Sequence, residues 1–551
     1  MCNVIFMHWA HLLRLSVPFA AFILLMSCGG GGGSKGPSQK SSSLPGTAAT
    51  LILNGKITYD FVPHHQDFVG LNYSATERRP VRGAVVELID SSGQVRASTI
   101  TGSDGTYSAN LEQNIFVKVR VKAQLLNSSS PSWDFKVTDN TSNNALYVLD
   151  GELASSGTTD SVRNLNASSG WGGFDYTGTR SAAPFAILDN VYTGVMRLME
   201  AGNTKNLRPL ELRWSSNNSA ADGDYARGEI GTSFYDGSAI YILGDANNDI
   251  DEYDPHVLLH EWGHYLESEL FRTDSIGGDH ADGRFLDMRV AMSEGFANAF
   301  SGMMINAANY SDASGVAQSS GFTFDISRKV RPNKGYFSEG SVGSILYNFY
   351  ASSENKIAND FTQLFQVLNS ASYYANDALT SIYLFYSEMK KQFPEYLPVL
   401  QTLMHEQTIW GENEYGENES NSGGLAFQLP IYKKVFINGN PLRTCSSNQY
   451  GEQNKLGNSQ FVMVNIAYPA LYKVEVIKSS DASVLSKPEF SLYLKGEKIT
   501  YVSNTINDKV FDIINLATGN YILEIYDKNY LDGERIHIKN TSCFDVRVTA
   551  N

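Results

Sequence analysis

Apolar and polar residues alternate in the first and last parts of the chain, whereas apolar residues recur at helical spacing between them. The alternation is clearest in Val-Lys-Val-Arg-Val-Lys at residues 117–122, which is typical of a strand with one buried face. Helical spacing is predicted over residues 184–201, 341–350, 361–368, 378–393 and 396–408. We therefore predict a multidomain chain, with a mixed α+β domain over residues 181–415 and all-β sandwich domains over 51–150 and 423–551.

The first 27 residues are typical of a secretory signal peptide. Arg14 precedes an apolar run from Leu15 to Met26, which is shorter than the roughly 20 residues that a membrane-spanning helix needs. The run ends in Leu-Met-Ser-Cys, which resembles a lipobox. This resemblance implies cleavage before Cys28 and a lipid anchor on its thiol. An uncleaved anchor helix is the alternative.

Residues 28–50 are rich in Gly, Ser and Pro and predict a flexible tether. Gly29, which follows the predicted lipid-bearing cysteine, differs from the aspartate that resembles an inner-membrane retention signal. We therefore expect a lipid-anchored protein of the bacterial outer membrane or cell surface, on its periplasmic or extracellular side.

Charge and cysteine content restrict the partners and the compartment. The chain has 43 basic and 58 acidic residues, which argues against a nucleic-acid partner. Of its four cysteines, Cys2 lies in the predicted signal and Cys28 is the predicted lipid site. Cys445 and Cys543 remain, and in an oxidising compartment we expect them to form a disulfide, with a free buried pair as the alternative.

The two β-rich parts resemble domains that accompany secreted enzymes. Gly-Lys-Ile at 55–57, the segment 80–88 and Asp-Gly-Thr-Tyr at 104–107 resemble transthyretin-like or carboxypeptidase-regulatory-like repeats, which implies an accessory or spacer role. Residues 516–525 resemble the closing strands of bacterial pre-peptidase C-terminal domains. Between the sandwich and the central domain, residues 151–180 predict a linker because Ser, Gly, Asn and Thr predominate.

The pattern that specifies chemistry by its spacing is His-Glu-Trp-Gly-His at residues 260–264, an HExxH motif. On a helix, His260 and His264 lie on the same face and can bind one ion, for which zinc is the best fit. Glu261 is then placed to take a proton from water as a general base. An Asp-Pro pair at 254–255 is typical of a helix start.

A catalytic zinc needs a third protein ligand and one open position. Leu270 occupies the place of the third histidine of the metzincin pattern, so Glu294, in Met-Ser-Glu-Gly-Phe, is the better candidate. With HExxH and a downstream glutamate, the chain resembles the gluzincins, the thermolysin-like and aminopeptidase-like zinc peptidases. The resemblance implies a zincin fold for residues 181–415 and a zinc ion on His260, His264 and Glu294. The spacing to Glu294 is longer than is usual there, which leaves the subfamily open.

The resemblance also suggests supporting residues. Asn298 matches the position at which thermolysin-like enzymes carry an acidic residue that orients a ligand histidine, and its amide oxygen can accept the same N–H. Tyr336 is the candidate for the tyrosine that stabilises the oxyanion in aminopeptidase-like members, with His280 as an alternative. Small residues form a row along the helix of Glu294 and predict its close approach to the histidine helix: Ala291, Gly295, Ala299 and Gly302.

Two segments before the motif receive weaker predictions. The apolar strand 238–243 is expected, by resemblance, to border the cleft and to pair with an extended substrate. The following loop, with oxygen donors from Asp245 to Asp251, resembles a calcium loop, but Ile250 replaces the glycine that an EF-hand requires. We expect a solvated acidic loop, with Ca²⁺ as the alternative. His64 and His65 are likewise expected to be a solvated pair.

The leading hypothesis is a lipid-anchored zinc metallopeptidase that hydrolyses peptide bonds of a protein or peptide substrate. An endopeptidase is favoured because the sequence shows no signature for gripping a free amino terminus. The alternative is a catalytically silent zincin-fold protein that binds or adheres at the cell surface. A zinc hydrolase of non-peptide substrates is a third hypothesis.

Overall fold

The computed structural model describes residues 49–551, apart from 353–358, 481, 483–484, 504–507 and 532–540. The predicted signal peptide, the lipidation site Cys28 and nearly all of the tether 28–50 therefore lie outside the described residues. Among the helices that are described, none is long and apolar enough to cross a membrane.

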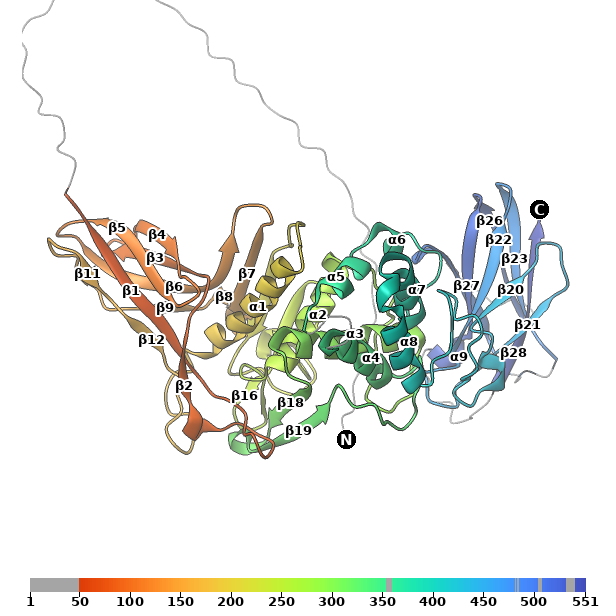
Figure 1. Cartoon of the computed structure of the whole chain (residues 1–551), viewed down its shortest axis with the longest axis horizontal. Helices are drawn as coiled ribbons and strands as arrows, with labels where there is room; N and C mark the ends of the chain where they lie inside the picture. The colour runs from red at the N-terminus through yellow and green to blue at the C-terminus, as the bar shows by residue number, and fades with distance from the viewer. Residues whose placement is uncertain (1–48, 353–358, 481, 483–484, 504–507, 532–540) are drawn as a thin grey trace, which may run out of the picture.

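Helices occupy the middle of the molecule, with β-rich parts at both ends (Figure 1). This multidomain arrangement agrees with the predicted fold class, while the assignment of the middle part as a zincin stays a prediction.

Two sheets make up the N-terminal part. In the smaller one, β1 (Thr50–Phe61) pairs with all four other strands: β2 (Glu77–Pro80), β5 (Thr106–Glu112), β11 (Ser161–Val162) and β12 (Leu165–Ala167). The larger has the order β14-β15-β13-β7-β6-β3-β4, with β8, β9 and β10 at its side. Its strands are β3 (Ala84–Asp90), β4 (Val95–Ile100), β6 (Phe116–Asn127), β7 (Trp133–Asp139), β8 (Ala145–Leu146), β9 (Val148–Asp150), β10 (Ala154–Ser155), β13 (Leu210–Trp214), β14 (Phe234–Tyr235) and β15 (Ala239–Ile242).

The larger sheet crosses the predicted boundary between the sandwich and the central domain. β7 pairs in parallel with β13, and β13 in parallel with β15, so strands assigned to two domains form one sheet. The predicted linker 151–180 also differs, because it contributes β10, β11 and β12. The physical reason is that the open edges of β1, β6 and β7 leave backbone groups that need partners, and polar segments satisfy them through main-chain bonds.

The central helices begin with α1 (Ala183–Glu200), α2 (Pro255–Glu269) and α3 (Met288–Ile305). They continue with α4 (Glu339–Ala351), α5 (Thr362–Leu368), α6 (Ala371–Tyr374), α7 (Ile382–Gln392) and α8 (Leu397–Glu406). α1 and α2 pack closely because the ring of Trp262 lies only 2.2 Å from the place where a Cβ would stand on Gly194. Any larger residue at Gly194 would push the helix of the HExxH motif away.

The row of small residues on α3 packs against a helix other than the predicted one. A Cβ on Gly295 would lie 2.6 Å from Val342 of α4, and one on Gly302 would lie 2.9 Å from Tyr347 of α4. Contact with α2 is instead made through Gly263, which faces Ala297 and Phe300. The row therefore brings α4, not the histidine helix, close to α3.

A small sheet lies beside the start of α2. Its strands, in the order β16-β17-β18-β19, are β16 (Gly244–Asp245), β17 (Asp249–Ile250), β18 (Asn309–Ser314) and β19 (Ser320–Asp325). The predicted acidic loop thus forms β16 and β17, and it pairs with a hairpin that follows α3.

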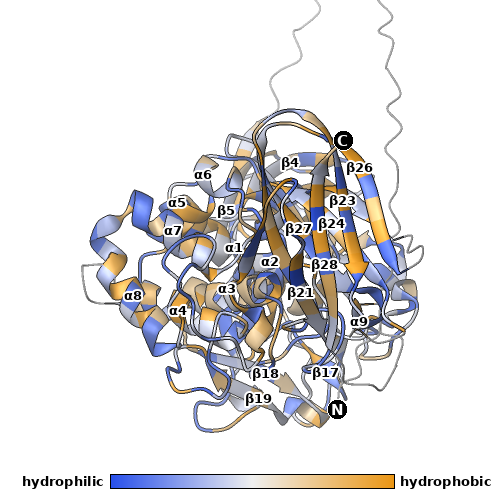
Figure 2. Cartoon of the chain, turned by 90° about the vertical axis from the view of Figure 1, so that its right-hand side faces the viewer, coloured by the Kyte–Doolittle hydropathy of each residue, from blue (hydrophilic) through white to orange (hydrophobic). Residues whose placement is uncertain are grey.

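The C-terminal part consists of two antiparallel-rich sheets with a common core of residues such as Val474, Leu523 and Val546. One holds β20 (Tyr432–Val435), β22 (Ser459–Ile466), β24 (Pro488–Leu494), β25 (Glu497–Val502) and β27 (Gly519–Asp527). The other holds β21 (Leu442–Ser447), β23 (Ala470–Lys478), β26 (Lys509–Leu516) and β28 (Thr541–Ala550), and a short helix α9 (Lys528–Leu531) follows β27. Apolar and polar residues alternate along these strands (Figure 2). The predicted disulfide is confirmed: Cys445 on β21 is bonded to Cys543 on β28.

A buried ion pair ties this part to the central helices. Arg289 at the start of α3 is 1% exposed and donates to Asp287 at 2.9 Å and to Glu524 of β27 at 2.5 Å. Ser459 and Tyr493 also donate to the Glu524 carboxylate, each at 2.8 Å. The C-terminal part is therefore fixed to the helix that carries Glu294.

Candidate metal centre

Two ligands of the candidate centre lie on α2. Pro255 occupies the first turn of α2, where a missing N–H costs nothing, and Asp254 precedes it. One turn separates His260 from His264, so both imidazoles emerge on the same face of α2. Their Nε2 atoms are 3.1 Å apart.

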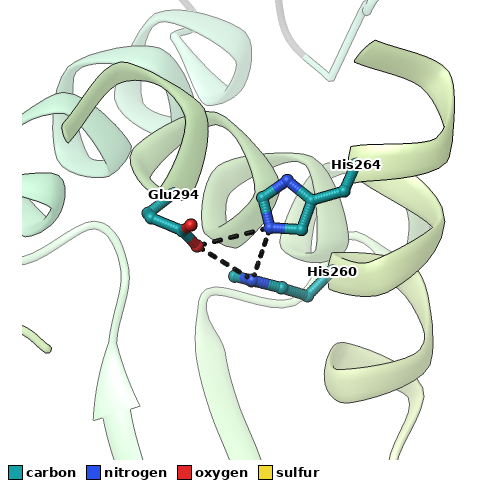
Figure 3. A group of neighbouring side chains, drawn as sticks. All are labelled: His260, His264 and Glu294. Atoms are coloured by element: carbon teal, nitrogen blue, oxygen red, sulfur yellow. Dashed lines mark hydrogen bonds and ion pairs between the residues drawn. The ribbon is translucent and has the colours of Figure 1, made fainter. Parts of the chain in front are cut away.

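Glu294 on α3 completes the group. Its Oε2 lies 3.3 Å from Nε2 of His260 and 3.3 Å from Nε2 of His264. Figure 3 shows the three side chains pointing toward one another from the two helices. The ligands of one tetrahedral zinc, at about 2.0–2.1 Å from the ion, are roughly 3.3 Å apart, which is the spacing seen here.

The far nitrogens of both histidines face hydrogen-bond acceptors. His260 Nδ1 is 3.0 Å from Oδ1 of Asn298, and His264 Nδ1 is 3.0 Å from Oε2 of Glu267. Ser293 in turn donates to Glu267 at 2.6 Å. In the neutral rings, a proton on Nδ1 that faces each acceptor leaves the lone pair on Nε2, and both Nε2 atoms face the same point.

The electrostatics of the group favour a cation at that point. Burial opposes a charge on His264, but the carboxylates of Glu294 and Glu267 hold the pKa of this imidazole well above its ordinary value. Burial also disfavours the Glu294 carboxylate, yet the neighbouring histidines, His280 first among them, lower its pKa well below its usual range. Glu294 Oε2 is buried and faces the Nε2 atoms of His260, His264 and His280 at 3.3 Å each. The donor set of two imidazoles and one carboxylate fits zinc.

Glu261 lies next to the ligands and is partly exposed. Its Oε2 accepts a hydrogen bond of 2.9 Å from the backbone N–H of Tyr235 on β14. β14 is the edge strand of the large sheet and runs antiparallel to β15. The strand predicted to border a cleft, β15, is flanked by β13 and β14 and so has no open edge. The edge beside Glu261 belongs to β14 instead.

His280, in the loop between α2 and α3, joins the group from the other side. Its Nε2 is 3.3 Å from Glu294 Oε2, and its Nδ1 is 2.9 Å from Oε2 of Glu339, the first residue of α4. Its ring lies parallel to that of His260, with ring centroids 6.4 Å apart. Burial lowers the pKa of His280, but Glu294 and Glu339 outweigh burial and raise it to about 9.

Tyr336 does not lie with these residues. Its side chain is 1% exposed, and its ring packs against Phe337 and Tyr383. Burial raises the pKa of its hydroxyl, and the polar groups that act on it are Glu419, Gln428 and Asp287 rather than the ligands. The predicted placement of Tyr336 at the centre is thus corrected, because its aromatic ring belongs to the hydrophobic core. The residues around Tyr336 in the sequence fit a core tyrosine as well as a catalytic one.

Sequence reasoning gave no role to three residues that the structure brings to the centre. Glu267 follows His264 by three residues on α2, a spacing that brings side chains together on a helix and could have indicated it. Ser293 precedes Glu294. Glu339 comes from α4 and carries no local signal, because only tertiary packing brings it to His280.

The acidic segment before α2 also differs from its prediction. Asp245 Oδ1 accepts from the backbone N–H of Asn247 at 3.1 Å. Asp249 and Asp251 lie instead with Asp312 of β18. His64 is not solvated but forms an ion pair with the buried Asp254. A group of three acidic side chains, Asp249, Asp251 and Asp312, is therefore present in addition to the candidate metal centre.

Comparison with known proteins gives one family match. Residues 198–408 match the Mycolysin C-terminal domain, a peptidase-associated domain. The search of curated proteins found no match. Among solved structures, the pre-peptidase C-terminal domain of collagenase from Bacillus anthracis is 11% identical to this chain, with a TM-score of 0.16. The alignment covers 21% of this chain and 93% of the collagenase domain. PliG of Aeromonas hydrophila, a periplasmic inhibitor of g-type lysozyme, is 12% identical, with 22% and 99% covered and a TM-score of 0.15. Similarities at such TM-scores support no conclusion about the fold.

The family match contains α2, α3 and every residue of the candidate metal centre, so the centre lies within a region similar to a peptidase-associated domain.

Proposed function

We propose that this chain is a zinc-dependent peptidase in which His260, His264 and Glu294 hold the metal and Glu261 is the general base. The observation that carries the proposal is the convergence of the two Nε2 lone pairs and one carboxylate oxygen at tetrahedral spacing, directly beside a partly exposed glutamate. The match of residues 198–408 to a peptidase-associated domain supports the same reaction class.

When bound, zinc supplies Lewis-acid chemistry, because it polarises a carbonyl group and lowers the pKa of a water molecule. The remaining work falls to side chains of this protein. The Glu261 carboxylate takes a proton from the attacking water and passes it to the amine that leaves when the peptide bond breaks. The N–H of Tyr235 holds this carboxylate in position at the edge of the sheet.

His280 is the residue of this chain best placed to stabilise the oxyanion, the role predicted for Tyr336. Its Nδ1 faces the Glu339 carboxylate, and Glu294 and Glu339 together raise its pKa to about 9 despite its burial. An Nε2–H beside the ligand Glu294 can donate to negative charge that develops on a substrate carbonyl oxygen.

An extended peptide is the substrate that suits the neighbouring sheet edge. β14 has no further strand on its outer side among the described strands, and its backbone already reaches Glu261. Main-chain pairing along such an edge gives affinity without demanding a sequence. We also propose, from the lipobox-like segment alone, that Cys28 anchors the peptidase to the bacterial outer membrane or cell surface.

The test combines metal content with proteolysis of denatured casein and of a mixed peptide library. We expect close to one zinc per purified chain and cleavage by the wild type. Glu261→Gln should keep its zinc and lose about 10²–10⁴-fold in rate, the contribution that a general base makes. The matched control is Glu269→Gln, on the same helix but paired with Arg208, which should cleave like the wild type.

Two outcomes would contradict the proposal. Absence of zinc from the wild-type chain would remove the metal site, and full activity of Glu261→Gln would remove the general base. Zinc without cleavage in any variant would favour the silent, surface-binding alternative.

A further inference from the structure

A second group of ligand-type side chains lies beside the start of α2. One carboxylate oxygen each from Asp249, Asp251 and Asp312 lies within 4.8 Å of the other two. Asp249 belongs to β17, and Asp251 is the first residue after this strand. Asp312 belongs to β18, which comes after α2 and α3 in the sequence. The group is separate from the histidine centre and shares no residue with it.

The hydrogen bonds of the chain leave this group unsatisfied. Asp251 is 2% exposed; its Oδ2 accepts from Ser233, but its buried Oδ1 has no hydrogen-bond partner among the described residues. The buried Oδ1 of Asp249 likewise has none there. The ion pairs seen in the described part of the chain include no lysine or arginine on any of the three. Two neighbouring carboxylates are compensated instead: Asp254 by His64 and Glu252 by Arg180.

The absence of compensation is costly, because burying an ionised carboxylate without a partner is one of the least favourable events in folding. Burial first, and then repulsion from the carboxylates of Asp254 and Glu252, raises the pKa of Asp249 to about 7. Burial, followed by repulsion from Asp254 and Asp249, raises the pKa of Asp312 to about 9. Burial and repulsion from Asp249 and Asp312 raise the pKa of Asp251 well above its usual value. Three acidic groups held this way form a strong site for positive charge.

We propose that Asp249, Asp251 and Asp312 bind one Ca²⁺ ion. The donors are all carboxylate oxygens, which hard cations prefer, and no nitrogen or sulfur ligand that would favour zinc takes part. Calcium binds oxygens at about 2.3–2.6 Å, so oxygens on opposite sides of the ion lie about 5 Å apart, and separations up to 4.8 Å fit within one shell. Magnesium, at about 2.0–2.1 Å, spans only about 4.2 Å. Water and backbone oxygens supply the remaining positions.

The position of the site gives the ion a structural role. It joins β17 to β18, which pair only through Asp249 and Ser314. β18 also contacts the segment that leads into α2, because the backbone N–H of Ala313 donates to Oδ2 of Asp254 at 3.2 Å. A bound ion therefore fixes the entry to the helix that carries His260 and His264.

The experiment measures thermal unfolding of the full chain, freed of divalent ions and then held at saturating zinc, with Ca²⁺ from zero to 10 mM. If the site binds with a Kd near 0.1 mM, within the range of extracellular calcium modules, we expect the Tm to rise by about 3 °C. Mg²⁺ at the same concentrations should raise it by less than half as much. Calorimetric titration should give one Ca²⁺ per chain.

The variants are Asp251→Asn and Asp312→Asn, with Asp245→Asn as the matched control on the same hairpin. Both site variants should lose the calcium response, while the control keeps it. Because each removes a repelling charge, the site variants without calcium should melt at or above the calcium-free wild type, which a merely misfolded variant would not do.

The proposal is overturned if calorimetry detects no Ca²⁺ on the wild type, if Mg²⁺ acts as strongly as Ca²⁺, or if the site variants respond to calcium like the wild type. Zinc content and peptide cleavage are measured on the same samples. A protein that binds calcium but no zinc would refute the proposed peptidase and leave this site standing, and the reverse result would do the opposite.

Discussion

The two ligand groups of this protein lie close together in the chain but differ in how they are held. In the candidate metal centre the histidine rings are oriented by hydrogen bonds to their Nδ1 atoms: His260 by Asn298 and His264 by Glu267, at 3.0 Å each. Asp249 and Asp312, by contrast, sit on short strands, and for Asp251 only one oxygen has a partner. The protein preorganises the first group, whereas the second would depend on the proposed ion.

This difference concerns how charge is balanced. In the histidine centre, Glu294 is buried, but the neighbouring His280 and His264 lower its pKa well below the usual range, so this carboxylate has partners without a metal. No such partner serves the aspartate group within the described residues. We therefore expect the histidine centre to keep its structure without a metal, whereas the aspartate group should be less stable without the proposed ion.

The largest effect is expected when one histidine of the candidate metal centre is removed, which tests whether the two groups act independently. His264→Ala should lower zinc affinity by at least about 1,000-fold and reduce cleavage to background, because each ligand of a zinc site contributes several kcal/mol. The calcium-induced rise in Tm should remain, since no ligand is shared. Zinc per chain and Tm are measured together.

The matched control is His256→Ala, one turn before His260 on the same helix. Its ring is buried and lies 3.2 Å from the carbonyl oxygen of Ala307, away from the ligands. This variant should be less stable but should retain zinc. Loss of zinc from His256→Ala alone would mean that α2 as a whole, rather than the ligand set, determines binding.

Glu524 is a buried carboxylate whose charge is compensated by a side chain of the protein itself, so it can be compared with both ligand groups. Glu524 is buried and paired with the guanidinium of Arg289 at 2.5 Å, which lowers the pKa of Glu524 despite its burial. Arg289→Met leaves the charge of Glu524 uncompensated and should reduce the free energy of unfolding by about 3–5 kcal/mol, as for other broken buried pairs. Denaturant unfolding provides the measurement.

Its control is Lys329→Met, which breaks an exposed pair with Glu406 of 3.0 Å and should cost about 1 kcal/mol or less. The double variant Arg289→Met, Glu524→Gln should recover part of the loss. If it recovers nothing, lost packing of Arg289 against Phe461, rather than charge, is the cause.

The convergence of His260, His264 and Glu294 could be predicted from the sequence because its information is local. A helix converts the spacing of His260 and His264 directly into a common face, and the small, apolar surroundings of Glu294 predict a buried second helix. Asn298 follows Glu294 by one helical turn and could be placed in the same way. The strands and the pairing of Cys445 with Cys543 were predictable for a similar reason, since alternation and compartment each act through few residues.

The rest depended on tertiary contacts that no spacing records. Asp312 reaches Asp251 only because β18 pairs with β17 after two helices have intervened, and Glu339 reaches His280 from α4. The continuity of the large sheet through β7 and β13 rests on backbone pairing, to which polar and apolar sequences contribute alike. Tyr336 shows the converse, because its surroundings in sequence suit a catalytic tyrosine while packing buries it in the core.

The smallest expected effect is on zinc affinity, when a residue that accepts a hydrogen bond from a ligand histidine is replaced. Asn298→Ala removes the acceptor of His260 Nδ1–H and should lower zinc affinity by about 10–100-fold, with activity restored by excess zinc. Asn298→Asp keeps an acceptor and adds charge, so it should bind zinc at least as tightly as the wild type. Competition with a chelator measures the affinity. Ser301→Ala, which removes a 2.8 Å bond to the carbonyl oxygen of Asn298 but leaves its side chain in place, is the control. Equal affinities for Asn298→Ala and Ser301→Ala would mean that His260 needs no support from behind, and the contrast between a preorganised and an ion-dependent site would then disappear.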